Sequence, residues 1–182
     1  YKDLHKIGAI LSDVVMRRTK KEVLTQLPER TDKNLFVTMT EKQSALHIEY
    51  AEAVVKLVAK WKRFGFLNEK DRQSLMIFLN MMRMVCDSTF ILDQETRNDT
   101  KIDELMNIFD TFFSSGDEKA VVFSQWERMT RLVAIELDKR NIQYEYLHGG
   151  IPSADRKKLF ENFTNNPQSK VFLSTDAGGV GL

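Results

Sequence analysis

Apolar residues recur at helical spacing in the first part of the chain. Residues 4–15 carry such a stripe and predict an amphipathic helix. A basic run, Arg17–Lys21, follows this helix. Residues 34–39 (NLFVTM) are instead rich in strand-forming side chains, so we expect a strand there. The first 40 residues therefore predict a helix, a basic linker and a strand.

Two longer amphipathic patterns come next, separated by a short break. Thr40 and Gln43 have the spacing of a capping box and predict the start of a long helix at residue 41. Gly65 interrupts the pattern, and a second helix is expected over residues 71–86. Two such helices joined by a short loop predict a helical hairpin. The side chains expected to face inward are Leu46, Tyr50, Ala53, Val54, Leu57, Val58 and Trp61 on the first helix, and Leu75, Phe78, Leu79, Met82 and Val85 on the second.

After residue 100 the pattern changes to short apolar runs that alternate with amphipathic helices. The expected strands are 120–123, 143–147 and 170–173, and the expected helices are 101–113, 127–139 and 153–163. Strands and helices that alternate at this spacing are typical of βαβ units. The second part of the chain therefore predicts an α/β fold with a parallel sheet flanked by helices.

Polar or glycine-rich loops follow all three predicted strands. Right-handed crossovers bring the carboxyl ends of parallel strands to one edge of the sheet, where open α/β sheets bind their ligands. In the third loop, three glycines in four positions let the backbone approach a ligand closely, with its N–H groups free to surround phosphate oxygens. Ser174 and Thr175 add hydroxyl donors, and Asp176 could accept from a sugar hydroxyl. The three loops are Ser124–Trp126, His148–Gly150 and Ser174–Gly181.

Each of these features also has a purely structural interpretation. The third loop could be an ordinary strand-to-helix turn, and His148 could be a hydrogen-bonded residue of a tight turn. Ser124 and Trp126 could cap a helix and fill the core. Arg156 could pair with a surface carboxylate rather than with a phosphate. The residues alone leave both interpretations open at this point.

Composition and absent motifs narrow the possible functions. The 182 residues include 27 basic and 26 acidic side chains, a net charge of +1, which excludes a polybasic protein but permits a local basic patch. A single cysteine, Cys86, excludes a disulfide framework and a multi-cysteine metal site. No apolar run is long enough to span a membrane. The chain has neither a G-x-x-x-x-G-K-[ST] phosphate loop nor a D-E-x-[HD] metal-binding pair.

Several segments together resemble a known family. KAVVFSQW, YLHGG, Ser153-x-x-Arg156 and VFLSTDAGGVGL resemble the second RecA-like lobe of helicase superfamily two. MRRTKKEVLTQLP, FVTMTEKQ and MMRMVCDSTF look like segments peculiar to the Swi/Snf-type, chromatin-remodeller-like DNA translocase ATPases. The resemblance extends from Leu4 to Leu182. Asp87-Ser88-Thr89 stands where many eukaryotic remodellers have Asn-His-Pro, which favours a bacterial or archaeal-type member.

The resemblance implies a domain layout. Residues 1–40 would hold the inter-lobe connecting helix, basic linker and strand. Residues 41–100 would form the helical protrusion of the second lobe. Residues 101–182 would be the RecA-like helicase C-terminal lobe, incomplete after motif V. In this family two such lobes sandwich ATP, and double-stranded DNA lies across both.

Roles for individual residues follow from the resemblance only. It implies DNA contacts for Ser124, Gln125, Trp126, His148, Gly149, Gly150, Arg156, Ser174 and Thr175. It implies ATP binding or coupling for Asp176, Gly178, Gly179 and Gly181. The cofactor would be ATP with Mg²⁺, whose ligands would lie in a first lobe before Tyr1, and the arginine finger would follow Leu182. We therefore expect no catalytic residue, no metal site and no ATP hydrolysis in this chain alone.

The implied function is the C-terminal lobe of an ATP-dependent double-stranded-DNA translocase or remodelling ATPase. Its partners would be double-stranded DNA, the first lobe of the same polypeptide and a DNA-bound protein, with no membrane. We expect a cytoplasmic, nucleoid-associated protein if the source is bacterial or archaeal, and a nuclear one if it is eukaryotic. The alternatives are the second lobe of a strand-separating DNA or RNA helicase and, more remotely, a non-catalytic flavodoxin-like or receiver-like module.

Overall fold

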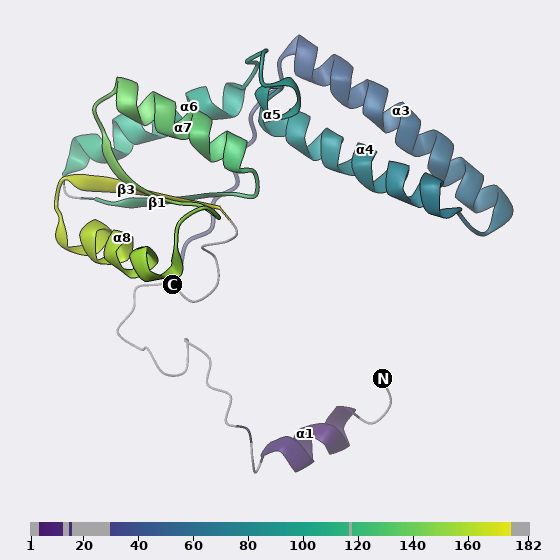
Figure 1. Cartoon of the computed structure of the whole chain (residues 1–182), viewed down its shortest axis with the longest axis horizontal. Coiled ribbons are helices and arrows are strands. Elements are labelled where there is room, and N and C mark those ends of the chain that lie inside the picture. The colour runs from purple at the N-terminus through teal and green to yellow at the C-terminus, as the bar shows by residue number, and fades with distance from the viewer. Residues whose placement is uncertain (1–3, 13–14, 16–29, 117, 176–182) are drawn as a thin grey trace. The chain divides into compact units, whose positions relative to one another are not determined.

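The computed structural model describes residues 4–12, 15, 30–116 and 118–175, and the chain divides into two units, residues 1–36 and 37–182. In the first unit, helix α1 spans Leu4–Ser12 (Figure 1). Its apolar side chains at Ile7, Ile10 and Leu11 are exposed. Of the helix predicted over residues 4–15, Val15 is not helical and residues 13 and 14 lie outside the described residues, as does the basic run at residues 17–21.

The strand predicted at residues 34–39 is wrong. Residues 30–40 form neither helix nor strand, and the Phe36 side chain is 95% exposed. The local sequence favours an extended backbone, but a strand also needs a neighbouring strand to satisfy its N–H and C=O groups. Within the described ranges no strand pairs with residues 34–39, and the Thr38 carbonyl accepts instead from Thr100 Oγ1 at 2.7 Å.

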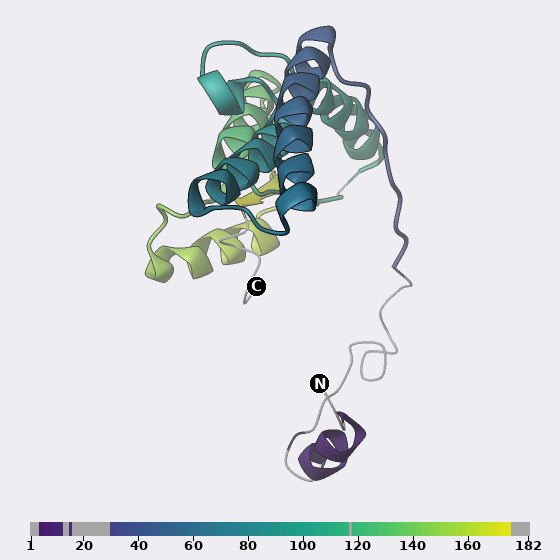
Figure 2. The same ribbon diagram turned by 90° about the vertical axis from the view of Figure 1, so that its right-hand side faces the viewer.

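The helical hairpin is confirmed. Helix α3 spans Glu41–Phe64 and helix α4 spans Glu69–Asp87, and the two lie side by side in both views (Figures 1 and 2). The Gln43 backbone N–H donates to Thr40 Oγ1 at 3.2 Å, and the Thr40 N–H donates to Gln43 Oε1 at 3.0 Å, which is the predicted capping box. Helix α3 ends at Gly65, whose φ of 75° favours glycine.

Two residues expected between these helices face solvent instead. Trp61 is 52% exposed and Leu79 is 39% exposed. The contact between the helices is made by pairs such as Tyr50 and Phe78, whose ring centroids lie 6.3 Å apart. Gln43 also joins the helices, because its Nε2 donates to Val85 O at 2.7 Å in a buried position. The seam is therefore partly polar at the base of the hairpin.

Removing the Gln43 side chain should loosen this seam. We expect Gln43→Ala to lower the free energy of unfolding by about 2 kcal/mol, because a cap is lost and the buried Val85 carbonyl is left without its partner. Urea denaturation followed by circular dichroism measures the change. The matched control is Gln73→Ala on the exposed face, where Nε2 donates only to Glu69; it should cost less than about 0.5 kcal/mol. Equal losses in the two variants would contradict the assignment.

The α/β part has the predicted parallel sheet. Strands β1 (Ala120–Ser124), β2 (Gln143–Leu147) and β3 (Ser169–Thr175) lie in the order β1-β3-β2, all parallel. Helices α6 (Thr100–Phe112) and α7 (Glu127–Lys139) cover one face, and α8 (Ser153–Asn165) covers the other (Figure 1). The core fills the space between α6, α7 and the sheet and includes Ile102, Met106, Phe109, Leu132, Val133, Leu137, Val171 and Leu173.

A buried polar junction joins the hairpin to the α/β part. Thr89 is 1% exposed, and its Oγ1 donates to Thr96 O and accepts from the Asn98 backbone and side chain. Ser88 is fully buried and donates to Asp99 Oδ2 at 3.1 Å. These bonds shape the short helix α5 (Phe90–Asp93), which periodicity did not predict. The junction fixes where α4 ends relative to α7.

Candidate nucleic-acid interface

The carboxyl ends of the three strands meet at one edge of the sheet, here called the strand-end edge. In the register of the sheet, Ser124 of β1 lies opposite Thr175 of β3, and Leu147 of β2 lies opposite Ser174. The parallel topology therefore brings the loops that follow the three strands to the same edge. The three strand ends that form this edge lie at residues 124, 147 and 175 of the sequence.

The first loop is held by its own backbone and by the hairpin. The Trp126 N–H donates to Ser124 Oγ at 3.3 Å, and the half-buried Trp126 ring packs against the core at the start of α7. Gln125 is exposed, and its Oε1 accepts a hydrogen bond from Arg83 Nη2 of α4. Arg83 is thereby placed at the strand-end edge, although it lies 42 residues away in sequence. No sequence pattern pointed to it.

The second loop is a tight turn around an imidazole. The Gly150 N–H donates to His148 Nδ1 at 3.2 Å, so this nitrogen acts as an acceptor. A Cβ on Gly150 would lie 3.0 Å from the His148 ring, which explains a glycine at this position. The His148 ring also packs against Tyr146, with centroids 4.9 Å apart. Gly149 is exposed beside it.

Arg156 is anchored in the first turn of α8, close to this loop. Its Nε donates to the Ile151 carbonyl at 3.3 Å, and the residue is half-buried. This bond uses one donor and leaves the rest of the guanidinium fork for another acceptor. Arg156 is thus joined to Ile151, the residue that follows the His148–Gly150 loop, rather than to a carboxylate.

The third loop is only partly described. Ser174 is fully buried and its Oγ donates to Thr175 O at 2.9 Å, so in this conformation its hydroxyl faces the protein. Thr175 is 7% exposed at the end of the central strand. The predicted residues Asp176, Gly178, Gly179 and Gly181 lie outside the described residues. Both residues predicted to contact phosphate through a hydroxyl are buried, and Thr175 is slightly more exposed than Ser174.

A cluster of charged and polar side chains at the start of α7 had not been predicted from the sequence. Glu127 Oε1 accepts from Arg131 Nε at 3.1 Å and Nη2 at 2.6 Å, and this pairing raises the pKa of the Arg131 guanidinium. The same carboxylate oxygen lies 3.9 Å from His148 Nδ1. Burial raises the pKa of Tyr146, whose hydroxyl is 2.7 Å from Thr130 Oγ1. Glu127 and Arg131 do have the i,i+4 spacing of a helical ion pair, the one signal that could have revealed them.

A groove of about 700 Å³ lies beside this cluster. It runs between α4, α5 and the start of α7, and its lining combines apolar and charged side chains. Trp126 and Arg131 line it together with Met81 and Met84 of the hairpin. The strand-end edge and the base of the hairpin therefore share one continuous surface.

A charge network on α7 stabilises the same helix away from the edge. Glu136 accepts from Lys139 at 2.8 Å, from Arg97 at 2.8 Å and from Arg140 at 3.1 Å. Lys139 and then Arg97 lower the pKa of Glu136 from 4.5 to about 2, against the opposing effect of burial. Arg97 also contacts Asp99, so the network links α7 to the junction below the hairpin.

This network predicts a pH dependence of stability. Because the pKa of Glu136 is lower in the folded chain than in the unfolded chain, its contribution is complete above about pH 4.5 and is lost as the pH falls toward 2. We expect Glu136→Gln to remove about 1 kcal/mol of pH-dependent stability in that window. Urea denaturation at several pH values tests this. The control Glu161→Gln removes an exposed pair with Lys157 and should leave the profile unchanged; identical profiles for wild type and Glu136→Gln would contradict the prediction.

The described ranges contain no group of three or more His, Cys, Asp or Glu side chains that could hold a metal ion. Within the same ranges, no helix is long and apolar enough to cross a membrane.

Comparison with known proteins defines the class of this fold. Residues 100–182 match the family model described as the helicase conserved C-terminal domain. The architecture agrees with the SWI2/SNF2 ATPase core domain of Sulfolobus solfataricus, at a TM-score of 0.70 and 24% identity over 98% of this chain and 37% of that one. The same ATPase core in complex with double-stranded DNA matches at a TM-score of 0.67 and 22% identity, covering 94% of this chain and 36% of that one. The α/β part therefore matches a helicase C-terminal domain and has the fold of a RecA-like lobe.

Curated relatives narrow the class further. "Chromodomain-helicase-DNA-binding protein 1-like" of Mus musculus is 27% identical over 100% of this chain and 20% of its own length. "Chromatin structure-remodeling complex subunit snf21" of Schizosaccharomyces pombe is 28% identical over 98% of this chain and 16% of its length. The chain is therefore similar over nearly its whole length to proteins of the Swi/Snf type, the family that its motifs resemble, and it spans a fifth or less of these relatives.

Two of the earlier expectations are affected. The inference of a bacterial or archaeal-type member is not confirmed, since the two curated relatives come from eukaryotes and the matched structures from Sulfolobus. The flavodoxin-like or receiver-like alternative conflicts with the helicase C-terminal match over residues 100–182.

Proposed function

We propose that this chain is the second lobe of an ATP-dependent double-stranded-DNA translocase, and that its strand-end edge contacts the phosphates of one DNA strand. One observation carries the proposal. Three guanidinium groups, from Arg83, Arg131 and Arg156, are anchored beside the loops of the strand-end edge in a chain whose net charge is only +1. Guanidinium groups suit phosphate oxygens because they present a planar fork of donors.

Some residues of these loops would contact DNA phosphates, and others would hold the backbone in place. The loop after β1 would contact the DNA strand along which the protein moves, through Ser124, Gln125 and Trp126. The loop after β2 would contact the same DNA strand through His148, Gly149 and Gly150. Thr175 would donate its hydroxyl to a phosphate at the end of the central strand, with Ser174 holding the backbone beside it. The matched structure of an ATPase core with double-stranded DNA supports this choice of partner.

ATP with Mg²⁺ is the proposed cofactor, bound between this lobe and a first lobe. The Mg²⁺ ligands would lie in the first lobe, as the resemblance to Swi/Snf-type ATPases implies. When bound, the nucleotide supplies the free energy that closes and opens the interface between the lobes. Asp176, Gly178, Gly179 and Gly181 would face this interface and couple it to the DNA contacts made by Thr175.

The remaining segments take supporting roles in this proposal. Residues 1–40 would connect the two lobes, residues 41–100 would form the helical protrusion, and residues 101–182 would form the RecA-like lobe. A DNA-bound protein would be the object that is moved. The protein would be nuclear if its source is eukaryotic, and cytoplasmic and nucleoid-associated otherwise.

A strand-displacement assay on the full-length protein tests the proposal. We expect ATP hydrolysis that duplex DNA stimulates, release of a third strand from a DNA triplex, and no separation of the duplex itself. Binding should also weaken steeply as salt rises, because phosphate contacts release counterions. Duplex unwinding without triplex release would instead support a strand-separating helicase of the same superfamily.

A further inference from the structure

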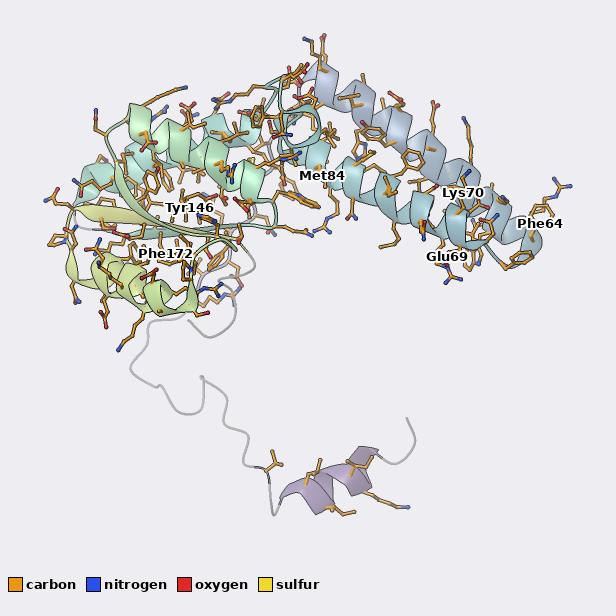
Figure 3. The ribbon with its side chains drawn as sticks, viewed as in Figure 1. Phe64, Glu69, Lys70, Met84, Tyr146 and Phe172 are labelled. Atoms are coloured by element: carbon orange, nitrogen blue, oxygen red, sulfur yellow. The ribbon has the colours of Figure 1, made fainter. Side chains whose placement is uncertain are left out.

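The loop end of the hairpin, residues 56–72, exposes large apolar side chains and is here called the hairpin tip. Trp61 is 52% exposed, Phe64 is 55% exposed and Phe66 is 68% exposed. Figure 3 places Phe64, Glu69 and Lys70 at this end, whereas Met84 lies at the base near the α/β part. Isolated exposed apolar residues are ordinary, but three exposed aromatic rings at one end of a hairpin, on the last turn of α3 and the loop after it, are typical of an interaction surface.

A cleft opens between these rings and the helices. It has a volume of about 450 Å³ and is lined by Val58, Trp61, Gly65, Phe66, Leu67, Arg72 and Leu75. All but Arg72 are apolar or lack a side chain, so the cleft suits a bulky apolar group. A single guanidinium at its rim would face an anionic neighbour of that group.

The charge of the hairpin tip is strongly one-sided. Its 17 residues include six basic and two acidic side chains, in a chain whose total charge is +1. Both acidic residues are already paired, Asp71 with Lys60 and Glu69 with Arg72 at 3.7 Å. Among the described residues, Lys56, Lys62 and Lys70 form no ion pair within 4.0 Å. The surface is therefore complementary to an acidic ligand with an apolar anchor.

We propose that the hairpin tip binds an acidic segment of a partner protein, with one bulky apolar side chain of that segment seated in the cleft. The apolar lining of the cleft favours a protein side chain as its occupant. A nucleic acid would bind mainly through its phosphates, which need exposed cations rather than an apolar cleft. The position also separates the two sites, because α3 has 24 residues and extends about 36 Å from the base of the hairpin. The inference does not depend on the DNA contacts proposed for the strand-end edge.

Fluorescence anisotropy with the full-length protein tests the inference. The probe is a labelled 13-residue peptide of glutamate and serine with one central leucine, and the matched peptide has serine at the centre. We expect the leucine peptide to bind at least about tenfold more tightly than the serine peptide. We also expect the double variant Trp61→Ala/Phe66→Ala to weaken its binding by a similar factor.

Two further variants distinguish a loss of peptide binding from a loss of folding. Lys62→Glu/Lys70→Glu leaves the aromatic rings in place and should weaken the peptide at least about fivefold at low salt. Val55→Ser, at an exposed position of α3 outside the tip, should bind as wild type. Three results would overturn the proposal: no binding of the leucine peptide, equal binding of the two peptides, or loss of duplex-DNA affinity in the tip variants. Self-association that Trp61→Ala/Phe66→Ala abolishes would assign the tip to a second copy and overturn it as well.

Discussion

Replacing Thr175 by valine in the full-length protein is expected to lower DNA-stimulated ATP hydrolysis by about tenfold to a hundredfold, with ATP affinity nearly unchanged. Valine keeps the shape of threonine and removes only the hydroxyl, so the central strand should fold as before. Thr175 lies opposite Ser124 in the sheet, at the edge where all three strands end. A hydrogen bond to a charged phosphate is worth about 1.5 to 3 kcal/mol, which sets the expected factor.

The matched control is Thr164→Val. Thr164 lies near the end of α8, and its hydroxyl donates to Phe160 O at 2.8 Å. This variant should keep DNA-stimulated hydrolysis within about twofold of wild type. Equal losses of ATP binding and turnover in Thr175→Val, or no loss of either, would contradict the role proposed for Thr175.

The second large effect concerns stability. We expect Phe172→Ala to lower the free energy of unfolding by about 3 to 5 kcal/mol, because the ring is 1% exposed and its removal leaves a cavity. Phe172 lies on the central strand, with the rings of Phe160 and Phe163 at 5.2 and 5.3 Å. Figure 3 shows it between the sheet and α8. Urea denaturation of the 182-residue chain, followed by circular dichroism, measures the change.

Phe66→Ala is the control for this substitution. It removes the same ring from the exposed hairpin tip and should cost less than about 1 kcal/mol. Comparable losses from the two variants would show that α8 does not pack on β3 as described here.

The sequence predicted those features that depend on local patterns. The Thr40 and Gln43 pair predicted the start of α3 because a capping box is completed within four residues. The alternation of strands and helices predicted a parallel sheet because each of these elements shows its own local pattern of apolar residues. The strand at residues 34–39 failed because strand formation needs a partner that local sequence does not reveal. Trp61 was predicted to lie between the two helices because helical spacing alone does not show where the neighbouring helix α4 begins.

In the candidate site, too, the features set by local patterns were predictable and those set by distant parts of the chain were not. The strand-end loops were predictable from topology, since parallel strands must end at one edge. Arg83 was not predictable, because its contact with Gln125 depends on where the junction at Ser88 and Thr89 places α4. The buried hydroxyl of Ser174 was also unexpected, since residue type alone does not show whether a serine faces the protein or a ligand.

Photo-cross-linking tests the central claim most directly. A photoreactive amino acid replaces either Gln125, at the strand-end edge, or Gln168, an exposed residue just before β3 at the opposite edge of the sheet. The full-length protein is then irradiated with labelled duplex DNA. We expect cross-links from position 125 that high salt abolishes, and none from position 168. Equal cross-linking from both positions, or cross-linking from position 168 alone, would contradict the proposal that this edge contacts DNA.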